Sequence, residues 1–272
     1  MVRVIRNIYI LIYLLSNKMG RVVDLGGKIK EYYKFSRSEI RTFIISILVL
    51  SFIISFREWG GIEFNLIVGL FNWFNAALIV TLVMFIYNGA QRIAGLSVGY
   101  NVEYKMWATG LLIGLVVAFA SRGKIWVLVP GGILIHHLAG HRLGYFRYGL
   151  GYFANGMIST AGSVAVISLA ALFKIINTAV GSGLLDKLIV FCIVFAIYDM
   201  LPIPPLSGGK LVYGSRMTYA FMFCTIVIAG VLLLLDINVF MAVLGSLVIG
   251  VILWLLYYIF FERKVWGGPY PK

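Results

Sequence analysis

The sequence predicts an all-α, polytopic membrane protein, first because of its composition and second because of its long apolar runs. Of the 272 residues, 61% are hydrophobic and only 12% are charged, whereas soluble domains are about 45–50% apolar and about 25% charged. So few charges cannot cover a surface with solvated groups, and we therefore expect the surrounding medium to be lipid. The 30 glycines and six prolines follow no period, which excludes collagen-like and low-complexity chains.

The positive charges predict how the chain is oriented. Nine of the 23 Lys and Arg residues lie before residue 42, as is typical of cytoplasmic segments, which anionic lipid attracts. We expect residues 1–42 to form a basic cytoplasmic arm, 43–262 the membrane domain and 263–272 a cytoplasmic tail. The net charge of +13 is thus explained without nucleic-acid binding. The prediction is an integral, multi-pass membrane protein with a cytoplasmic N-terminus and an even number of spans.

The first apolar run, Ile5–Ser16, is about a dozen residues long, and a spanning helix needs about 20. Two alternatives stay open for it: an interfacial helix over residues 5–16, or a native start at Met19. Cys192 and Cys224 lie in apolar runs without CxxC spacing, so we expect packing residues there and no disulfide or zinc knuckle.

The membrane domain contains several further apolar runs, and we expect six to eight membrane segments plus one re-entrant element. The runs are Phe43–Phe56, Phe64–Tyr87, Met106–Ser121, Ile125–His137, Tyr152–Phe173, Leu184–Leu201, Met217–Leu235 and Val239–Phe261.

The run Ile125–His137 differs from the others. It reads IWVLV-PGG-ILIHH, with β-branched residues on both sides of a Pro-Gly-Gly turn, which is typical of a hairpin. We predict that Ile125–Val129 pairs with Ile133–His136 about Pro130-Gly131-Gly132. At membrane depth such a hairpin is tolerated only where protein or water satisfies its backbone.

Polar residues within apolar runs indicate three candidate sites, because polar groups are costly in lipid. The first is Tyr87–Arg92 (YNGAQR), where Tyr87 and Gln91 share a helix face beside Asn88; by spacing alone this is a polar helix end.

The second candidate is Ile197–Lys210 (IYDMLPIPPLSGGK), in which three prolines must break a membrane helix. Asp199 comes just before the break, and Ser207 follows it with two glycines. A broken helix with an acidic residue usually lines a cavity or a site, so Asp199 is the polar intramembrane candidate.

The third candidate contains all three histidines, His136, His137 and His141, in ILIHHLAGHR. His137 and His141 have the i, i+4 spacing with which two imidazoles bind one metal. Leu138 stands where a zincin has its general-base Glu, and we therefore keep metal binding here as an alternative only.

Taken in order, these motifs resemble the archaeal branch of the site-2 protease family, the intramembrane zinc metalloproteases. The resemblance runs from about Phe35 to Arg216, with a core at about 64–216, and LPIPPL followed by Gly-Gly is its most specific part. It implies a helix bundle with a short re-entrant β-hairpin.

The resemblance also implies where the family's zinc site would lie. Its HExxH motif aligns with Tyr87-Asn88-Gly89-Ala90-Gln91, so that Tyr87 and Gln91 replace the histidines and Asn88 replaces the Glu. The third ligand, an Asp in an LDG motif, aligns with Ser207, and the family's small-residue helix aligns with Ala161-Gly162-Ser163. Because Tyr, Gln and Ser are poor zinc ligands, we expect vestigial positions, no catalytic residue and no cofactor.

We therefore expect a catalytically inactive, site-2-protease-like protein that binds a transmembrane partner or belongs to a membrane complex, through a strand edge of the hairpin. One alternative is an active zinc metalloendopeptidase with a relocated Zn²⁺ site at His136, His137 and His141, with Asp199 or Glu103 as base. Another is an ion- or proton-coupled transporter that uses Asp199, although no second broken helix supplies an inverted repeat.

Overall fold

The protein is described here by a computed structural model, which covers residues 25–60, 64–137, 151–235 and 237–262. These residues are mostly helical and include one two-stranded antiparallel sheet. The helices are α2 (Arg37–Ser55), α3 (Leu66–Val98), α4 (Ala108–Ala120), α5 (Tyr152–Val180), α6 (Gly183–Asp199), α7 (Ser207–Gly214), α8 (Arg216–Leu234) and α9 (Val239–Tyr257), which continues as a π-helical turn (Tyr258–Glu262); the strands are β1 (Tyr100–Met106) and β2 (Gly131–His137).

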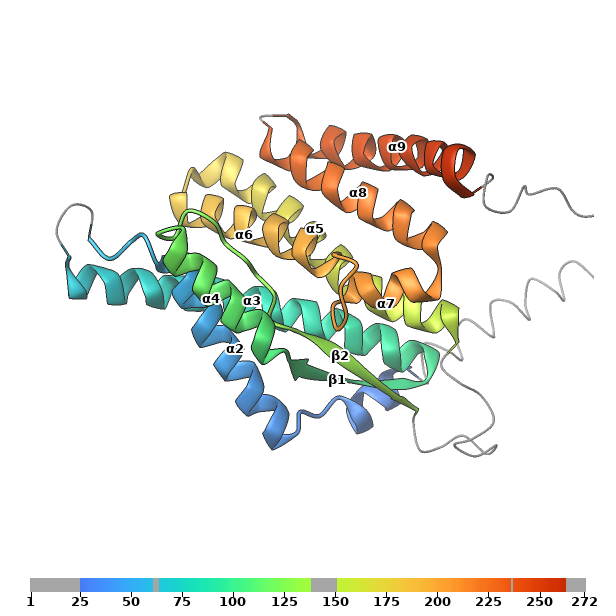
Figure 1. The fold of residues 1–272 in the computed structure, drawn as a ribbon, viewed down its shortest axis with the longest axis horizontal. Coiled ribbons are helices and arrows are strands. Elements are labelled where there is room, and N and C mark those ends of the chain that lie inside the picture. Colours follow the sequence, from blue (N-terminus) through green and yellow to red (C-terminus); the bar gives the residue numbers. More distant parts are fainter. Residues whose placement is uncertain (1–24, 61–63, 138–150, 236, 263–272) are drawn as a thin grey trace, which may run out of the picture.

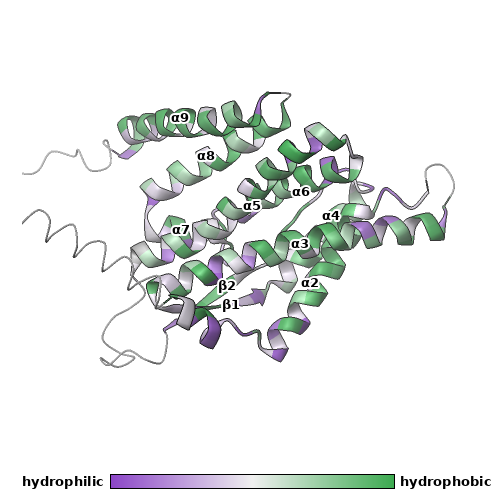
Figure 2. Ribbon diagram, turned by 180° about the vertical axis from the view of Figure 1, so that it is seen from behind, coloured by the Kyte–Doolittle hydropathy of each residue, from purple (hydrophilic) through white to green (hydrophobic). Residues whose placement is uncertain are grey.

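Five of the helices are long and apolar enough to cross a membrane: α2, α3, α5, α8 and α9. Their outward faces are apolar as well; Phe71 on α3 is 65% exposed and Phe240 on α9 is 70% exposed. Figure 2 shows hydrophobic residues along most of α9, and such all-round hydrophobicity is typical of helices in lipid. The apolar runs that were predicted to be helical form helices in the structure. One of them, α4, is short and has 13 residues.

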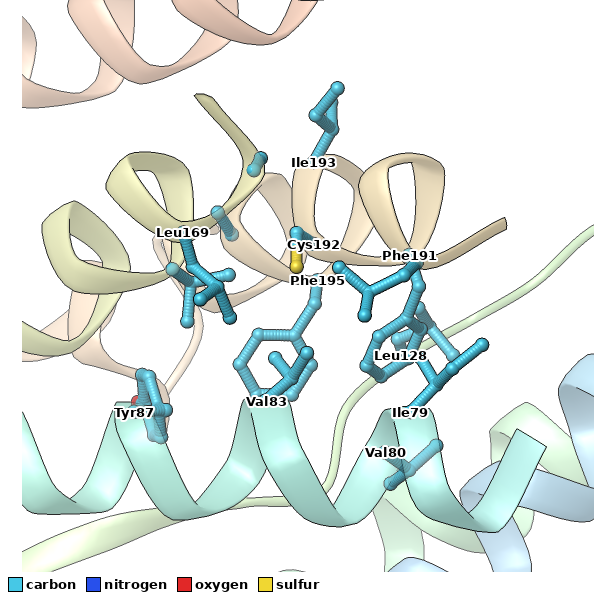
Figure 3. Packing of buried hydrophobic residues seen from close by; sticks show 14 of the residues in the cluster. Ile79, Val80, Val83, Tyr87, Leu128, Leu169, Phe191, Cys192, Ile193 and Phe195 are labelled. Atoms are coloured by element: carbon cyan, nitrogen blue, oxygen red, sulfur yellow. The ribbon is translucent and has the colours of Figure 1, made fainter. Parts of the chain in front are cut away.

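The helices form one bundle around α3, α5 and α6 (Figure 1). α2, α4 and the sheet lie on one side of this centre, and the α8–α9 pair packs on the other side, against α5 and α6. The core follows a stripe of α3 at four-residue spacing, which Figure 3 shows facing α5 and α6. Its members are Ile79, Val83 and Tyr87, opposite Leu169, Phe191 and Phe195.

α3 extends well beyond the predicted run. It has 33 residues, about 50 Å at 1.5 Å per residue, and ends at Gly99, whose φ of 94° is the left-handed conformation that glycine favours. Tyr87–Arg92 is therefore not the polar helix end that its spacing suggested. Tyr87, Asn88, Gln91 and Arg92 are all buried inside the bundle.

The predicted hairpin is wrong in its pairing. β2 is extended as expected, but its partner is β1, with Tyr100 opposite His137 and Met106 opposite Gly131. Residues 125–130 are not part of the sheet; together with α4 they form the connection between the two strands. Residues Tyr100–Met106, which apart from Met106 lie outside the predicted apolar runs, supply the missing strand.

The two glycines after Pro130 suggested a turn in the sequence but have a different role in the structure. A Cβ on Gly131 would lie 2.3 Å from the Lys105 carbonyl oxygen, and one on Gly132 would lie 2.1 Å from the Pro205 carbonyl oxygen. Backbone approaches β2 on both sides here, and only glycine leaves room for it. The glycines are needed for close packing and not for a tight turn.

α2 contacts the sheet through Glu39, which also forms a buried ion pair with α3. Glu39 pairs with Arg92 of α3, and its Oε1 accepts the backbone N–H of Tyr104 at 2.8 Å. The Tyr104 hydroxyl lies 2.7 Å from Ser46 Oγ of α2 and donates to the Pro130 carbonyl at 2.9 Å. On the outer edge of β1, the N–H of Tyr104 is therefore already hydrogen-bonded to Glu39.

Candidate functional site

Four elements meet in a buried polar cluster, which we define as Tyr87 of α3, Ser163 of α5, Asp199 of α6, Ser207 of α7 and Gln91 of α3. The Tyr87 hydroxyl donates to Asp199 Oδ1 at 2.6 Å and lies 2.9 Å from Ser207 Oγ. Ser163 donates to Asp199 Oδ2 at 2.5 Å, and Gln91 Nε2 donates to Ser207 Oγ at 3.2 Å. None of the five side chains is more than 4% exposed.

The proline break places two of these residues. α6 ends at Asp199 and α7 begins at Ser207, as the prolines predicted. The chain folds back so tightly that a Cβ on Gly208 would lie 2.2 Å from the Met200 carbonyl oxygen. Because of this tight return, the backbone N–H of Ser207 also reaches Asp199 Oδ1, at 3.4 Å.

α5 approaches the cluster through Gly162. A Cβ there would lie 2.5 Å from the Tyr87 ring and 2.9 Å from Gln91 Nε2. The small residue lets α5 pack directly on α3, and the next residue, Ser163, then reaches Asp199. Sequence reasoning noted Ala161-Gly162-Ser163 as a small-residue helix but assigned Ser163 no role; its signal was a hydroxyl beside a glycine in an apolar helix.

The donors of the cluster all lead towards Asp199. Tyr87 gives its single proton to Asp199, so the bond between Tyr87 and Ser207 must be donated by Ser207. Ser207 in turn accepts from Gln91. The result is a directed chain from Gln91 through Ser207 and Tyr87, and it ends at a carboxylate oxygen of Asp199, which accepts the last hydrogen bond.

Asn88 is buried like its neighbours but does not join the cluster. Its Nδ2 donates to the Met84 carbonyl of its own helix at 2.8 Å. The structure therefore brings together three of the four positions implied by the resemblance, Tyr87, Gln91 and Ser207, and adds Asp199. Gln91 Oε1 has no hydrogen-bond partner among the residues that the structure describes.

The histidines lie elsewhere. His136 is opposite Asn101 in the sheet, and its Nε2 lies 3.9 Å from the carboxylate of Glu103. His137 stacks obliquely on Tyr100 with 4.9 Å between ring centres, and His141 lies outside the described residues. β2 carries His136 four residues beyond Gly132, which adjoins Pro205, or about 13 Å along the strand. Within the described ranges, no three His, Cys, Asp or Glu side chains are arranged to hold a metal ion.

Lys210 is a residue that sequence reasoning did not single out. It lies one helical turn after Ser207, and its Nζ donates to the Ile133 carbonyl of β2. Burial lowers the pKa of the Lys210 ammonium from its usual 10.5 to about 8, although the nearby Asp199 charge acts in the opposite direction. Its signal in the sequence was a cation three residues after the proposed site residue Ser207.

A comparison with known proteins shows similarity to a distant relative. Over 196 residues the chain is 26% identical to an archaeal protein of Methanocaldococcus jannaschii named "Putative zinc metalloprotease"; the match covers 70% of this chain and 91% of the relative. No family model matches the chain, and no solved structure matches it. The similarity supports a distant relationship to a site-2-protease-like family.

Proposed function

We propose that the chain is a catalytically inactive, site-2-protease-like membrane protein that binds a transmembrane segment of a partner. The observation that carries this proposal is the polar cluster. At the positions where the resemblance implies zinc ligands, Tyr87, Gln91 and Ser207 hydrogen-bond to one another and to Asp199. The five apolar helices support the membrane setting.

The residues present do not fit a catalytic zinc ion. Catalytic zinc is bound by three protein ligands drawn from His, Cys and carboxylates, with one open position. The cluster offers one carboxylate, and both of its oxygens already accept from Tyr87 and Ser163. Hydroxyl and amide groups are weak ligands beside imidazole, and we therefore derive no metal-dependent step.

The zinc content of the purified full chain tests the proposal. We expect no stoichiometric zinc in the parent protein and about one zinc per chain in the variant Tyr87→His, Asn88→Glu, Gln91→His and Ser207→Asp. The combination Tyr87→Phe, Asn88→Gln, Gln91→Leu and Ser207→Ala is the matched control and should bind none. A folded quadruple variant without zinc would show that these positions are not the family's metal frame.

The partner-binding part of the proposal depends on the outer edge of β2. In an antiparallel pair, opposed residues alternately bond to each other and point their N–H and C=O groups outwards. Because the Tyr104 N–H goes to Glu39, its partner Ile133 points outwards, and so does Ile135 two residues on. Among the described residues, the hydrogen bond to these outward groups comes from Lys210, at the Ile133 carbonyl.

An extended segment could therefore add to β2 by main-chain hydrogen bonds. We expect a photo-crosslinking residue at Leu134, which is 41% exposed, to capture a partner in the native membrane more efficiently than one at Phe240 of α9. Ile135→Pro removes an outward N–H that the sheet does not use and should abolish capture, whereas Ile135→Ala keeps the N–H and should retain it. Equal capture by both Ile135 variants would contradict strand pairing.

A second candidate function is an active zinc metalloendopeptidase, favoured by the name of the relative. On this chain it would need a zinc site at His136, His137 and His141. Stoichiometric zinc in the parent protein that is lost in His137→Ala, with proteolysis lost in parallel, would support this function and contradict the inactive one.

A further inference from the structure

Lys210 is a partly buried cation without an ion-pair partner among the described residues. Its hydrogen bond goes to a neutral group, the Ile133 carbonyl. A cation withdrawn from water is costly unless a negative charge accompanies it. Lys210 therefore lies in a position where a carboxylate would be stabilising.

Asp199 is close enough to affect Lys210 but is not free to pair with it. Tyr87 donates to Oδ1 of Asp199 and Ser163 donates to Oδ2, and the Ser207 backbone adds a third donor. With these donors neither oxygen is left for a direct bond to Lys210. Asp199 therefore acts on the Lys210 ammonium only through its charge, and a direct ion-pair partner has to come from outside the cluster.

The position of Lys210 indicates where that charge would come from. Its Nζ reaches the outer edge of β2 at the Ile133 carbonyl, two residues before Ile135, the next residue that points outwards. A segment that pairs with β2 would run along this edge, with its side chains beside the Lys210 ammonium. Glu103, the carboxylate that faces His136, projects from β1, on the other strand of the sheet.

We infer that the transmembrane segment bound at β2 carries an acidic side chain, Asp or Glu, which pairs with Lys210. This inference rests on the proposed function and names the chemistry of its partner. Main-chain bonds to β2 would accept almost any extended segment. The cation adds selection, because a buried charge rejects a segment that brings no counter-charge.

Two synthetic peptides test the inference on the full chain in phosphatidylcholine nanodiscs. Each is a Leu- and Ala-rich transmembrane peptide of about 25 residues with a central Gly-Asp-Gly or Gly-Asn-Gly. We expect the Asp peptide to bind about tenfold or more tightly than the Asn peptide, as close buried charge pairs do. This comparison uses the parent protein and does not depend on the folding of any variant.

Variants of Lys210 then test whether its ammonium group causes the preference for the Asp peptide. The preference for Asp should fall to about twofold or less in Lys210→Met and persist in Lys210→Arg. It should also persist in Lys105→Met, which removes an exposed cation from β1. Retained preference in a folded Lys210→Met would overturn the inference.

The peptide results separate failure of the inference from failure of the proposed function. If both peptides bind equally and Ile135→Pro abolishes binding, the strand edge binds partners but Lys210 does not select them, and the inference is wrong. If neither peptide binds, the proposed function fails and the inference fails with it. If phosphatidylglycerol nanodiscs remove the Asp preference, lipid phosphate is the counter-ion of Lys210, and the inference is again overturned.

Discussion

At the scale of single residues, Tyr87 is the centre of the polar cluster. Its hydroxyl forms hydrogen bonds both with Asp199 at the end of α6 and with Ser207 at the start of α7. Its ring meets Phe195 edge to face, with 5.2 Å between centres, so one side chain continues the apolar stripe of α3 and also satisfies a buried carboxylate.

Tyr87→Phe keeps the ring and removes only the hydroxyl. We expect it to destabilise the protein by about 1–3 kcal/mol, because Asp199 and Ser207 each lose a buried partner. Tyr213→Phe is the matched control, since Tyr213 is 76% exposed. Denaturant titration in detergent would measure both, and equal stability of the two variants would show that the hydroxyl is not structurally important.

At the scale of elements, the site depends on close contact between helices that are distant in sequence. Gly162 brings α5 onto Tyr87, and Gly208 folds the start of α7 back onto the end of α6. In the sheet, Gly132 allows β2 to lie against Pro205. Small residues therefore allow close approach at three places around one cluster. The contact at Gly162 is the one between two long apolar helices, where small residues are expected for packing in lipid.

Gly162→Ala tests the contact between α5 and α3. The new methyl group would lie 2.5 Å from a fully buried ring, so overpacking should cost about 1–3 kcal/mol. Gly183→Ala is the control, because a Cβ there meets nothing within 4 Å. A melting temperature that falls only in Gly162→Ala is the expected result; a fall in neither variant would argue against this helix contact.

At the scale of the whole molecule, the basic segment before α2 is attached to the bundle. Arg92 of α3 donates to the Lys34 carbonyl at 2.9 Å and lies over the Phe35 ring, 4.1 Å from its centre. Lys30 and Lys34 remain exposed. The segment therefore shares the side of the membrane that the C-terminal end of α3 faces.

A labelling experiment tests on which side of the membrane the basic segment lies. In a background without Cys192 and Cys224, Lys28→Cys should react with a membrane-impermeant maleimide only after cells are opened, because basic segments are retained in the cytoplasm. A cysteine at Arg57, at the opposite end of α2, should react in intact cells. The reverse pattern would contradict the predicted orientation.

Features that depend on neighbouring residues could be predicted from the amino-acid sequence. Composition and apolar runs predicted the helices, and three prolines predicted the break between Asp199 and Ser207. The resemblance implied that Tyr87, Asn88 and Gln91 would lie against that break. The contacts place Tyr87 and Gln91 there, whereas Asn88 bonds within its own helix. Their roles as vestigial positions, and the partner, remain proposals.

Which distant segments meet could not be predicted in this way and became clear from the folded structure. In the structure, β2 pairs with β1 and not with Ile125–Val129. α3 is longer than predicted, so that Tyr87 and Gln91 are buried inside the bundle. Ser163 and Lys210 also reach the site. The physical reason is that prolines and apolar periodicity act over a few residues along the chain. Strand pairing and burial depend instead on which backbone fits closely against another, and at Gly132 and Gly162 that fit is set by residues 73 and 75 positions away, at Pro205 and Tyr87.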